Sequence, residues 1–291
     1  MTVVDWTTLL AHREVETLLA LAVEEDLGPG DLTTRGVFEG PVTARGAIVA
    51  RIATVACGLP LAQALFRRFD GELVTTPMVD EGAWVDPGTT LLEVHGDIRP
   101  MLSAERCGLN FLMRLCGIAH GARQAAERVP EGCRAQIFDT RKTTPGWRRL
   151  EKAAVRTGGA ANHRVGLFDA VLIKDNHIAA AGSIAQAIAG TRAKSPEGTV
   201  IEVEIDRLDQ LDEALSASPD IVLLDNFSLD DLRIAVERTG GRAELEASGG
   251  MTLERIPEVA RTGVDRISLG ALTHTVVPAD LGLDLMEDPR P

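Results

Sequence analysis

The stretch FDTRKTTPGWRRLEKAAVRTGGAANHRVGLFDAVLIKDNH, residues 138–177, carries both the structural repeat and the strongest charge anomaly of the chain. It begins at the end of an apolar run, continues through a helical pattern over 146–158, and ends with a second apolar run, DAVLIKD. Residues 141–174 contain eight Lys or Arg and two acids, within a chain of net charge −13. Such an island favours a site for a small, highly anionic ligand, because a nucleic-acid surface is more often backed by a basic domain.

An alternative explains part of this charge. Residues 147–157 alone fit an amphipathic surface helix whose charges are solvated. That explanation does not cover Arg141, Lys142 and Lys174, because each stands where an apolar, strand-like run ends.

The strand–helix alternation continues to the end of the chain. Apolar, β-branched runs recur at 135–139, 169–175, 200–206, 220–226, 243–248 and 265–271. Helical stretches are predicted at 146–158, 183–194, 207–217, 229–239 and 252–262. Six β–α units with two-sided apolar strands predict a parallel sheet of the kind that forms a β/α barrel.

Polar residues follow the predicted strands. The strand ends carry the segments 139–142, 174–177, 225–226, 248–250 and 268–270, and Glu204 ends another strand. In such barrels the carboxyl ends of the strands converge on the active site, so these residues are the candidate site.

Ser248, Gly249 and Gly250 follow one strand and precede a helical stretch. The main chain of a Gly-rich strand–helix turn can approach a phosphate closely, and Gly270 after the next strand could complete the cradle. An ordinary β–α turn is the alternative, but the position at the penultimate strand of a barrel favours phosphate.

Four further side chains could carry chemistry. Glu204 and Asp225 could hold magnesium, bind sugar hydroxyls, or be satisfied by the cations opposite. Lys174 could form a Schiff base or bind anions. His163, beside Arg164, could be an acid/base group or a packing histidine.

The first hundred residues have a different texture. An amphipathic helix is predicted at 14–26, strand-like runs around 42–57, 72–76 and 85–96, and a long, largely buried helix from about 100 to 128. The four cysteines show no metal-ligand spacing, which favours reduced thiols in a cytoplasmic protein. No signal peptide and no membrane span are expected, since no run of about eighteen apolar residues occurs.

Several motifs together give a resemblance. DTRKTTPG at 139–146, the GGxxNHR pattern at 158–164 and VLIKDNH at 171–177 resemble the quinolinate phosphoribosyltransferase family. VEEDLGPGDLTT, SAERCGLNFL, EVE, LLDN, ASGG and SLGALTH fit the same family in order, so the resemblance covers nearly the whole chain. Trp147, Ala154 and Ala160 depart from the family pattern. They are packing positions at the edge of the site, so the departures bear on the detailed geometry of substrate binding and not on the reaction.

The resemblance implies an α/β fold: an open, incomplete β/α barrel with an N-terminal α/β sandwich domain. We expect residues 1–115 to form the N-terminal domain, 116–275 the barrel, and the tail 276–291 to return to the first domain. A homodimer with shared active sites is also implied, in which Arg106 reaches the partner's site.

The implied reaction joins quinolinate and phosphoribosyl pyrophosphate to give nicotinate mononucleotide, pyrophosphate and CO2, with Mg²⁺ as cofactor and no nucleic-acid or membrane partner. The catalytic group implied is Lys142, Lys174, Glu204 and Asp225, of which the two acids would also face magnesium and ribose. The carboxylates and pyrophosphate are assigned to Arg106, Arg141, Lys142, His163, Arg164 and Lys174. Further substrate-binding residues are Thr140, Ser248, Gly249, Gly250, Ser268, Gly270 and Ala271.

The sequence leaves two other functions open. A Schiff-base aldolase would use Lys174 as nucleophile, although the excess of arginines argues against it. A pyrophosphorylase-like relative associated with molybdate transport would keep the fold and lose part of the cation set, which is complete here.

Overall fold

The computed structural model describes residues 4–286, which fall into two compact units. The first contains residues 4–123, 143–159 and 276–286, and the second contains residues 124–142 and 160–275. Within residues 4–286, no helix combines the length and the apolar character needed to cross a membrane.

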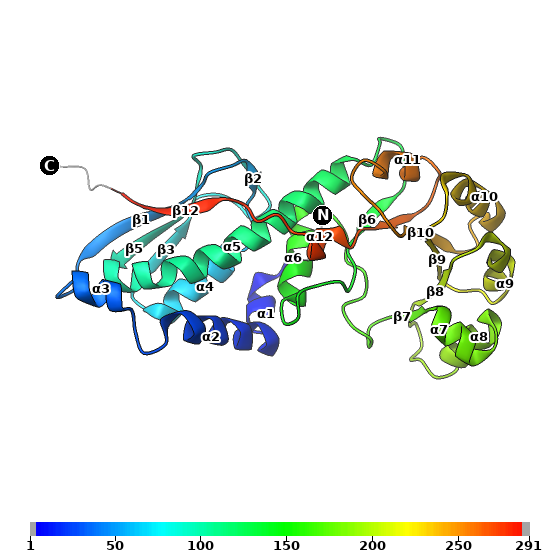
Figure 1. Cartoon of the computed structure of the whole chain (residues 1–291), viewed down its shortest axis with the longest axis horizontal. Helices are drawn as coiled ribbons and strands as arrows, with labels where there is room; N and C mark the ends of the chain where they lie inside the picture. Colours follow the sequence, from blue (N-terminus) through cyan, green and yellow to red (C-terminus); the bar gives the residue numbers. More distant parts are fainter. Residues whose placement is uncertain (1–3, 287–291) are drawn as a thin grey trace. The chain divides into compact units, whose positions relative to one another are not determined.

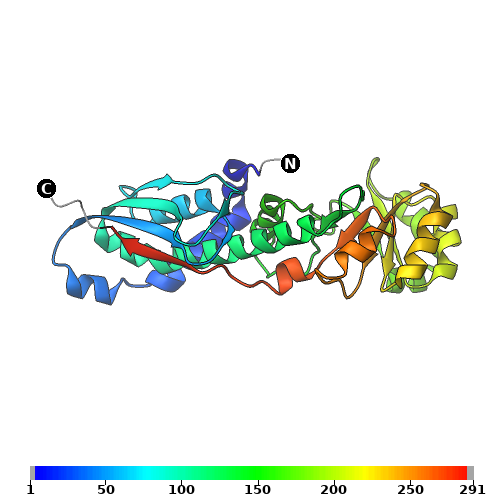
Figure 2. The same ribbon diagram turned by 90° about the horizontal axis from the view of Figure 1, so that it is seen from above.

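The first unit is built on an antiparallel sheet. Its strand order is β12-β1-β5-β3, made of β1 (Thr43–Ala50), β3 (Val74–Pro77), β5 (Thr90–Asp97) and β12 (Leu281–Leu285). A separate two-stranded sheet pairs β2 (Thr54–Val55) with β4 (Trp84–Val85). The tail thus adds a strand to the N-terminal sheet, and Figure 2 shows β12 alongside β1.

Helices complete the first unit. They are α1 (Trp6–Leu10), α2 (Arg13–Leu27), α3 (Leu32–Val37), α4 (Leu59–Phe69), α5 (Ile98–Glu127) and α6 (Arg148–Gly158). The predicted helices at 14–26 and 100–128 correspond to α2 and α5. Gly108 of α5 lies against Phe66 of α4 so closely that an added Cβ would meet the ring at 3.1 Å.

The second unit contains a six-stranded parallel sheet in the order β6-β11-β10-β9-β8-β7. Its strands are β6 (Gln136–Phe138), β7 (Val171–Ile173), β8 (Ile201–Ile205), β9 (Ile221–Asp225), β10 (Glu244–Ser248) and β11 (Arg266–Ser268). The first strand pairs with the last, as in a barrel, and the linear order ends at β6 and β7. The predicted open β/α barrel with an α/β N-terminal unit is therefore confirmed.

Helices follow the barrel strands and flank them in Figure 1. They are α7 (Asp175–Ala181), α8 (Ile184–Arg192), α9 (Leu211–Ser216, after a short 3₁₀ turn at Leu208–Gln210), α10 (Leu229–Thr239), α11 (Ile256–Ala260) and α12 (Ala271–His274). Local chemistry sets their ends: Ser228 caps α10 by accepting the Asp231 N–H at 3.1 Å, and Gly240 ends it in the left-handed region. The stretch predicted at 252–262 forms a shorter helix because Pro257 lies in its first turn, where proline is tolerated.

Strand register aligns the candidate site residues. Asp225 pairs with Ser248, Glu204 pairs with Leu223, and Ser268 pairs with Phe138, the residue before Asp139. The carboxyl ends of these parallel strands therefore lie at one edge of the sheet, where the polar segments emerge.

Candidate active site

Lys174 and Glu204 form an ion pair at the ends of neighbouring strands. Lys174 follows β7 and is the N-cap residue of α7, while Glu204 lies near the end of β8. The Lys174 side chain is 45% exposed and that of Glu204 19% exposed, so both remain accessible to a ligand. Asp225 ends β9 on the other side of Glu204, which places two carboxylates and one ammonium along three adjacent strands.

The turn after β10 requires glycine. Gly249 has φ +92°, and a Cβ there would lie 2.2 Å from Oδ1 of Asn226 and 2.8 Å from its backbone nitrogen. Asn226 itself adopts φ 58° and donates its backbone N–H to the Ser248 carbonyl at 2.9 Å. The turn is thus locked against the end of β9, with Gly250 also at positive φ, +53°. Because the two glycines carry no side chain, an oxyanion can approach the main chain of this turn closely.

Lys142 lies against the turn after β11. A Cβ on Gly270 would meet Cδ of Lys142 at 3.0 Å, and the Thr273 hydroxyl donates to the Lys142 carbonyl at 2.8 Å. The Thr140 hydroxyl accepts the Lys142 backbone N–H at 3.0 Å. The segment after β6 and the start of α12, including Gly270, therefore come together, and the Lys142 side chain remains exposed.

Arg141 and Arg164 are close enough to repel each other. Burial lowers the pKa of Arg164, and the charge of Arg141 lowers it further. Arg164 is held in place by an Nη1 donation to the Ala170 carbonyl at 3.2 Å. Two neighbouring, partly buried guanidinium groups can together bind an anion with two charged oxygens.

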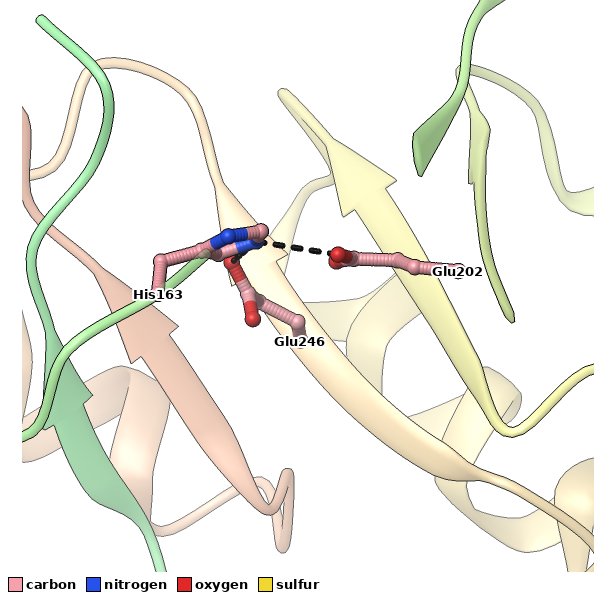
Figure 3. A group of neighbouring side chains, drawn as sticks. All are labelled: His163, Glu202 and Glu246. Carbon is pink, nitrogen blue, oxygen red and sulfur yellow. Dashed lines mark ion pairs between the residues drawn. The ribbon is translucent and has the colours of Figure 1, made fainter. Parts of the chain in front are cut away.

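His163 is held by Asp139, one of the predicted strand-end residues, and by two acids inside the strands. Asp139, fully buried at the end of β6, accepts the His163 backbone N–H at 2.8 Å and the Asn162 side-chain amide at 2.7 Å. The His163 ring turns toward the barrel strands, where its Nε2 lies 2.9 Å from Glu202 and 3.6 Å from Glu246 (Figure 3). The 9%-exposed imidazole is thus anchored at both its backbone and its ring.

The remaining predicted residues are distributed as follows. Ser268 is buried at the end of β11, and Ala271 is exposed at the start of α12. Arg106 belongs to α5 in the first unit, where its side chain is exposed.

Glu202, Glu246 and Arg266 were not among the predicted site residues. Each belongs to a strand, two positions before a strand-end candidate: Glu202 precedes Glu204, Glu246 precedes Ser248, and Arg266 precedes Ser268. Because side chains alternate along a strand, such residues face the same side as the strand-end residue. An ionisable residue in a strand, two positions before a candidate at its carboxyl end, was the available signal.

Along the carboxyl edge, the second unit combines cations, two carboxylates and a glycine turn free of side chains. Such an arrangement suits a ligand with phosphate, carboxylate and hydroxyl groups. It also provides for the neutralisation of negative charge that develops on a leaving group.

Comparison with known proteins agrees with this chemistry. The chain matches the family models for the quinolinate phosphoribosyl transferase N-terminal domain over residues 31–116 and C-terminal domain over residues 118–284. It is 41% identical to a probable nicotinate-nucleotide pyrophosphorylase [carboxylating] of Bacillus subtilis, covering 94% of each chain. It is 43% identical to the nicotinate-nucleotide pyrophosphorylase [carboxylating] of Mycobacterium leprae, covering 91% of this chain and 94% of that protein.

Solved structures give the same assignment. The nicotinate-nucleotide pyrophosphorylase of Francisella tularensis superposes with a TM-score of 0.89 at 36% identity, covering 94% of this chain and 96% of that one. The Ehrlichia chaffeensis protein of the same name gives 0.88 at 36% identity, covering 93% and 98%. The motifs, the open barrel and these matches over both domains establish that the chain belongs to the quinolinate phosphoribosyltransferase family.

Proposed function

We propose that this protein transfers the phosphoribosyl group of phosphoribosyl pyrophosphate to quinolinate and decarboxylates the adduct, forming nicotinate mononucleotide in NAD biosynthesis. The observation that carries the proposal is the carboxyl edge of the barrel. There, the Gly249 turn lies beside Asp225, and Lys174 and Glu204 stand on the next strands. Relatives that align over nearly the whole chain bear the name of this activity.

The residues fit the charges of both substrates. The arginine pair, Arg141 and Arg164, suits the adjacent carboxylates of quinolinate. Lys142 and Lys174 would neutralise the pyrophosphate, while the glycine turn and Gly270 would receive the 5-phosphate. Glu204 and Asp225 would face the ribose hydroxyls.

The reaction then needs little covalent help from the protein. The pyridine nitrogen forms a bond to the anomeric carbon as the bond to pyrophosphate breaks, and the cations stabilise the leaving group. The nitrogen, now cationic, accepts the electron pair when the adjacent carboxylate leaves as CO2, and the ring carbon then takes up a proton.

Magnesium fits the acids at this edge. Glu204 and Asp225 supply two carboxylates on neighbouring strands, and Mg²⁺ in phosphate sites is commonly held by one or two carboxylates plus water and substrate oxygens. The ion would supply further charge neutralisation to the pyrophosphate. We expect activity to be lost with chelator and restored by Mg²⁺.

We also propose that the active unit is a homodimer in which Arg106 serves the partner's barrel. Arg106 is exposed on α5 rather than at a barrel strand end. Mixing Arg106→Ala subunits with Lys142→Ala subunits should restore part of the activity, because each mixed dimer contains one site with both residues intact. No recovery after verified subunit exchange would contradict the shared site.

Lys174 acts in this proposal as a charged group and not as a nucleophile. Its ammonium donates to Glu204, whereas Schiff-base formation requires a free amine. Lys174→Arg should therefore retain more activity than Lys174→Met. A borohydride-stable adduct at Lys174, with both variants equally inactive, would favour the aldolase function instead.

The reaction is tested directly by product analysis. The purified protein, supplied with quinolinate, phosphoribosyl pyrophosphate and Mg²⁺, should release CO2, pyrophosphate and nicotinate mononucleotide in equal amounts. A Glu237→Gln variant, altered on the barrel helix α10, is the control for general damage. Absence of nicotinate mononucleotide with folded protein would refute the proposal.

A cytoplasmic location stays a prediction, in keeping with four cysteines that are all free thiols.

A further inference from the structure

A buried cluster of four ionisable side chains lies inside the barrel, beneath the strand-end residues. His163 comes from the segment after α6, Glu202 from β8, Glu246 from β10 and Arg266 from β11. Figure 3 shows the His163 ring facing the Glu202 carboxylate, with the Glu246 carboxylate beside the ring. The Nε2 atom of His163 lies 2.9 Å from Glu202 and 3.6 Å from Glu246, and Nε of Arg266 lies 2.9 Å from the other oxygen of Glu246.

The cluster is almost fully buried. The side chains of Glu246 and Glu202 are 0% and 3% exposed, and those of His163 and Arg266 are 9% and 12% exposed. The Arg266 guanidinium is also stacked on the ring of Phe138, 3.8 Å from its centroid. Buried charges of this kind are tolerated only when they are paired and nearly balanced.

Among these four side chains, two carboxylates and one guanidinium sum to −1, and a proton on Glu246 or on His163 makes that sum zero. The charge of Arg164, which is partly exposed, also acts on Glu202. Burial and the charge of Glu202 raise the pKa of Glu246 to about 7. For His163, burial lowers the pKa, but Glu202 and Glu246 outweigh burial, so the net direction is upward. Either group is thus a candidate for the proton.

Backbone geometry decides between them. The Arg164 backbone N–H donates to Nδ1 of His163 at 2.7 Å, so Nδ1 must offer its lone pair. The ring proton is then on Nε2, directed at Glu202, and the imidazole is neutral. The additional proton therefore belongs to Glu246. Around Glu246 the facing groups are Glu202, His163, Arg266 and the Ser268 hydroxyl, while its partner on β9 is the apolar Leu223.

A metal ion is the competing occupant. His163, Glu202 and Glu246 offer three ligand atoms within 4.8 Å of one another. Arg266, however, already provides a fixed cation 2.9 Å from Glu246, and a divalent ion would leave the buried group with net positive charge. The proton satisfies the charge balance and the metal ion does not.

We propose that Glu246, supported by Arg266, is a positioning residue: it keeps the one proton that the cluster retains, so that His163 stays the neutral tautomer whose Nε2–H is donated to Glu202. The other ring nitrogen, Nδ1, accepts the Arg164 backbone N–H and so fixes the backbone of the residue expected to bind a substrate carboxylate. The link to turnover rests on the proposed function, whereas the tautomer does not.

The first test needs no catalytic activity. Two-bond ¹H–¹⁵N correlation spectra of the whole protein, labelled at histidine, report which ring nitrogens are protonated. The His163 signal, identified by its loss in His163→Gln, should show protonation at Nε2 alone at about pH 6.5. Protonation of both nitrogens, or of Nδ1 alone, would overturn the proposal even if the enzyme is fully active.

The second test uses Glu246→Gln, which keeps the shape of the protonated acid and cannot ionise. The ratio of kcat/KM for the variant to that of wild type should rise as pH passes about 7, by up to about tenfold per pH unit. The matched control is Glu244→Gln, which alters an exposed acid 3.8 Å from the same Arg266 and should give a constant ratio. A constant ratio for Glu246→Gln, or a tightly bound metal ion lost in that variant, would reject the proton-holding role.

Discussion

The Arg114–Glu151 pair offers the sharpest test of how the segment after Lys142 is held. Glu151 of α6 is fully buried, and it receives Nη2 of Arg114 at 2.5 Å and Nε at 3.0 Å. Its other oxygen accepts the Thr144 backbone N–H at 3.2 Å. Arg114 also lies 5.6 Å from the Trp147 ring, which stacks on Phe111 at 4.6 Å.

Replacing Arg114 with Met leaves a buried carboxylate without its counter-charge. Breaking a buried pair in this way costs about 3–5 kcal/mol of unfolding free energy, of which the lost cation–π contact is about 0.5–1 kcal/mol. Glu151→Gln keeps a hydrogen-bonding side chain and should cost about 1–2 kcal/mol. In the double variant the uncompensated charge is absent, so the total should be smaller than the sum by at least about 1 kcal/mol.

Urea unfolding at one fixed protein concentration measures these changes, since subunit association would otherwise shift the midpoint. Arg233→Met is the control, because its ion pair with Asp230 is exposed and worth little. If Arg114→Met lowers the free energy of unfolding by less than about 1 kcal/mol, the pair does not hold the segment that carries Thr144 and Trp147.

Further outcomes follow from other contacts. Gly249→Ala should raise the KM for phosphoribosyl pyrophosphate about tenfold, because the positive φ and the 2.2 Å approach of the new Cβ to Asn226 must displace the turn. Gly241→Ala is the control: its φ is also positive, but it has open space around it, and the KM should not change. A thiol reagent should label Cys133 rapidly in the native protein and the other three cysteines slowly. Burial raises the pKa of Cys57, that of Cys107 to about 11 and that of Cys116 to about 12, so few of these thiols are ionised. Rapid labelling of several thiols would contradict this burial. Burial and the charge of Glu202 raise the pKa of Glu246 from 4.5 to about 7. The stability that Glu246 contributes should therefore be complete below pH 4.5 and lost as pH rises through about 7, by a few kcal/mol at most. Tm measured against pH should show this decline in wild type and not in Glu246→Gln.

Much of the barrel could be predicted because its determinants are local. β-branched apolar runs separated by helical patterns identified all six strands, and the polar segments after them placed Lys174, Glu204, Asp225 and Gly249 at one edge. Strand ends are readable in sequence because polarity changes there over one or two residues.

Pairings inside the fold were not predictable in the same way. Glu246 and Arg266 face each other only because β10 and β11 are neighbours in register, and Glu202 reaches the same point from two strands away. The ring of His163 turns inward because Asp139 holds its backbone and Glu202 holds its ring. The sequence around His163, with Arg164 next to it, does not indicate this orientation. Trp147, which departs from the family pattern, is accommodated by Phe111 and Arg114, residues distant in sequence.

We propose that the cation-rich edge of the barrel receives a pyridine with two adjacent carboxylates. The most direct measurement compares kcat/KM for quinolinate and nicotinate with phosphoribosyl pyrophosphate held saturating. Nicotinate would leave a guanidinium such as Arg164 without its counter-ion in a partly desolvated site, so quinolinate should be preferred by at least about a thousandfold. Comparable turnover of both acids would contradict the assignment of Arg141 and Arg164 to the carboxylate pair.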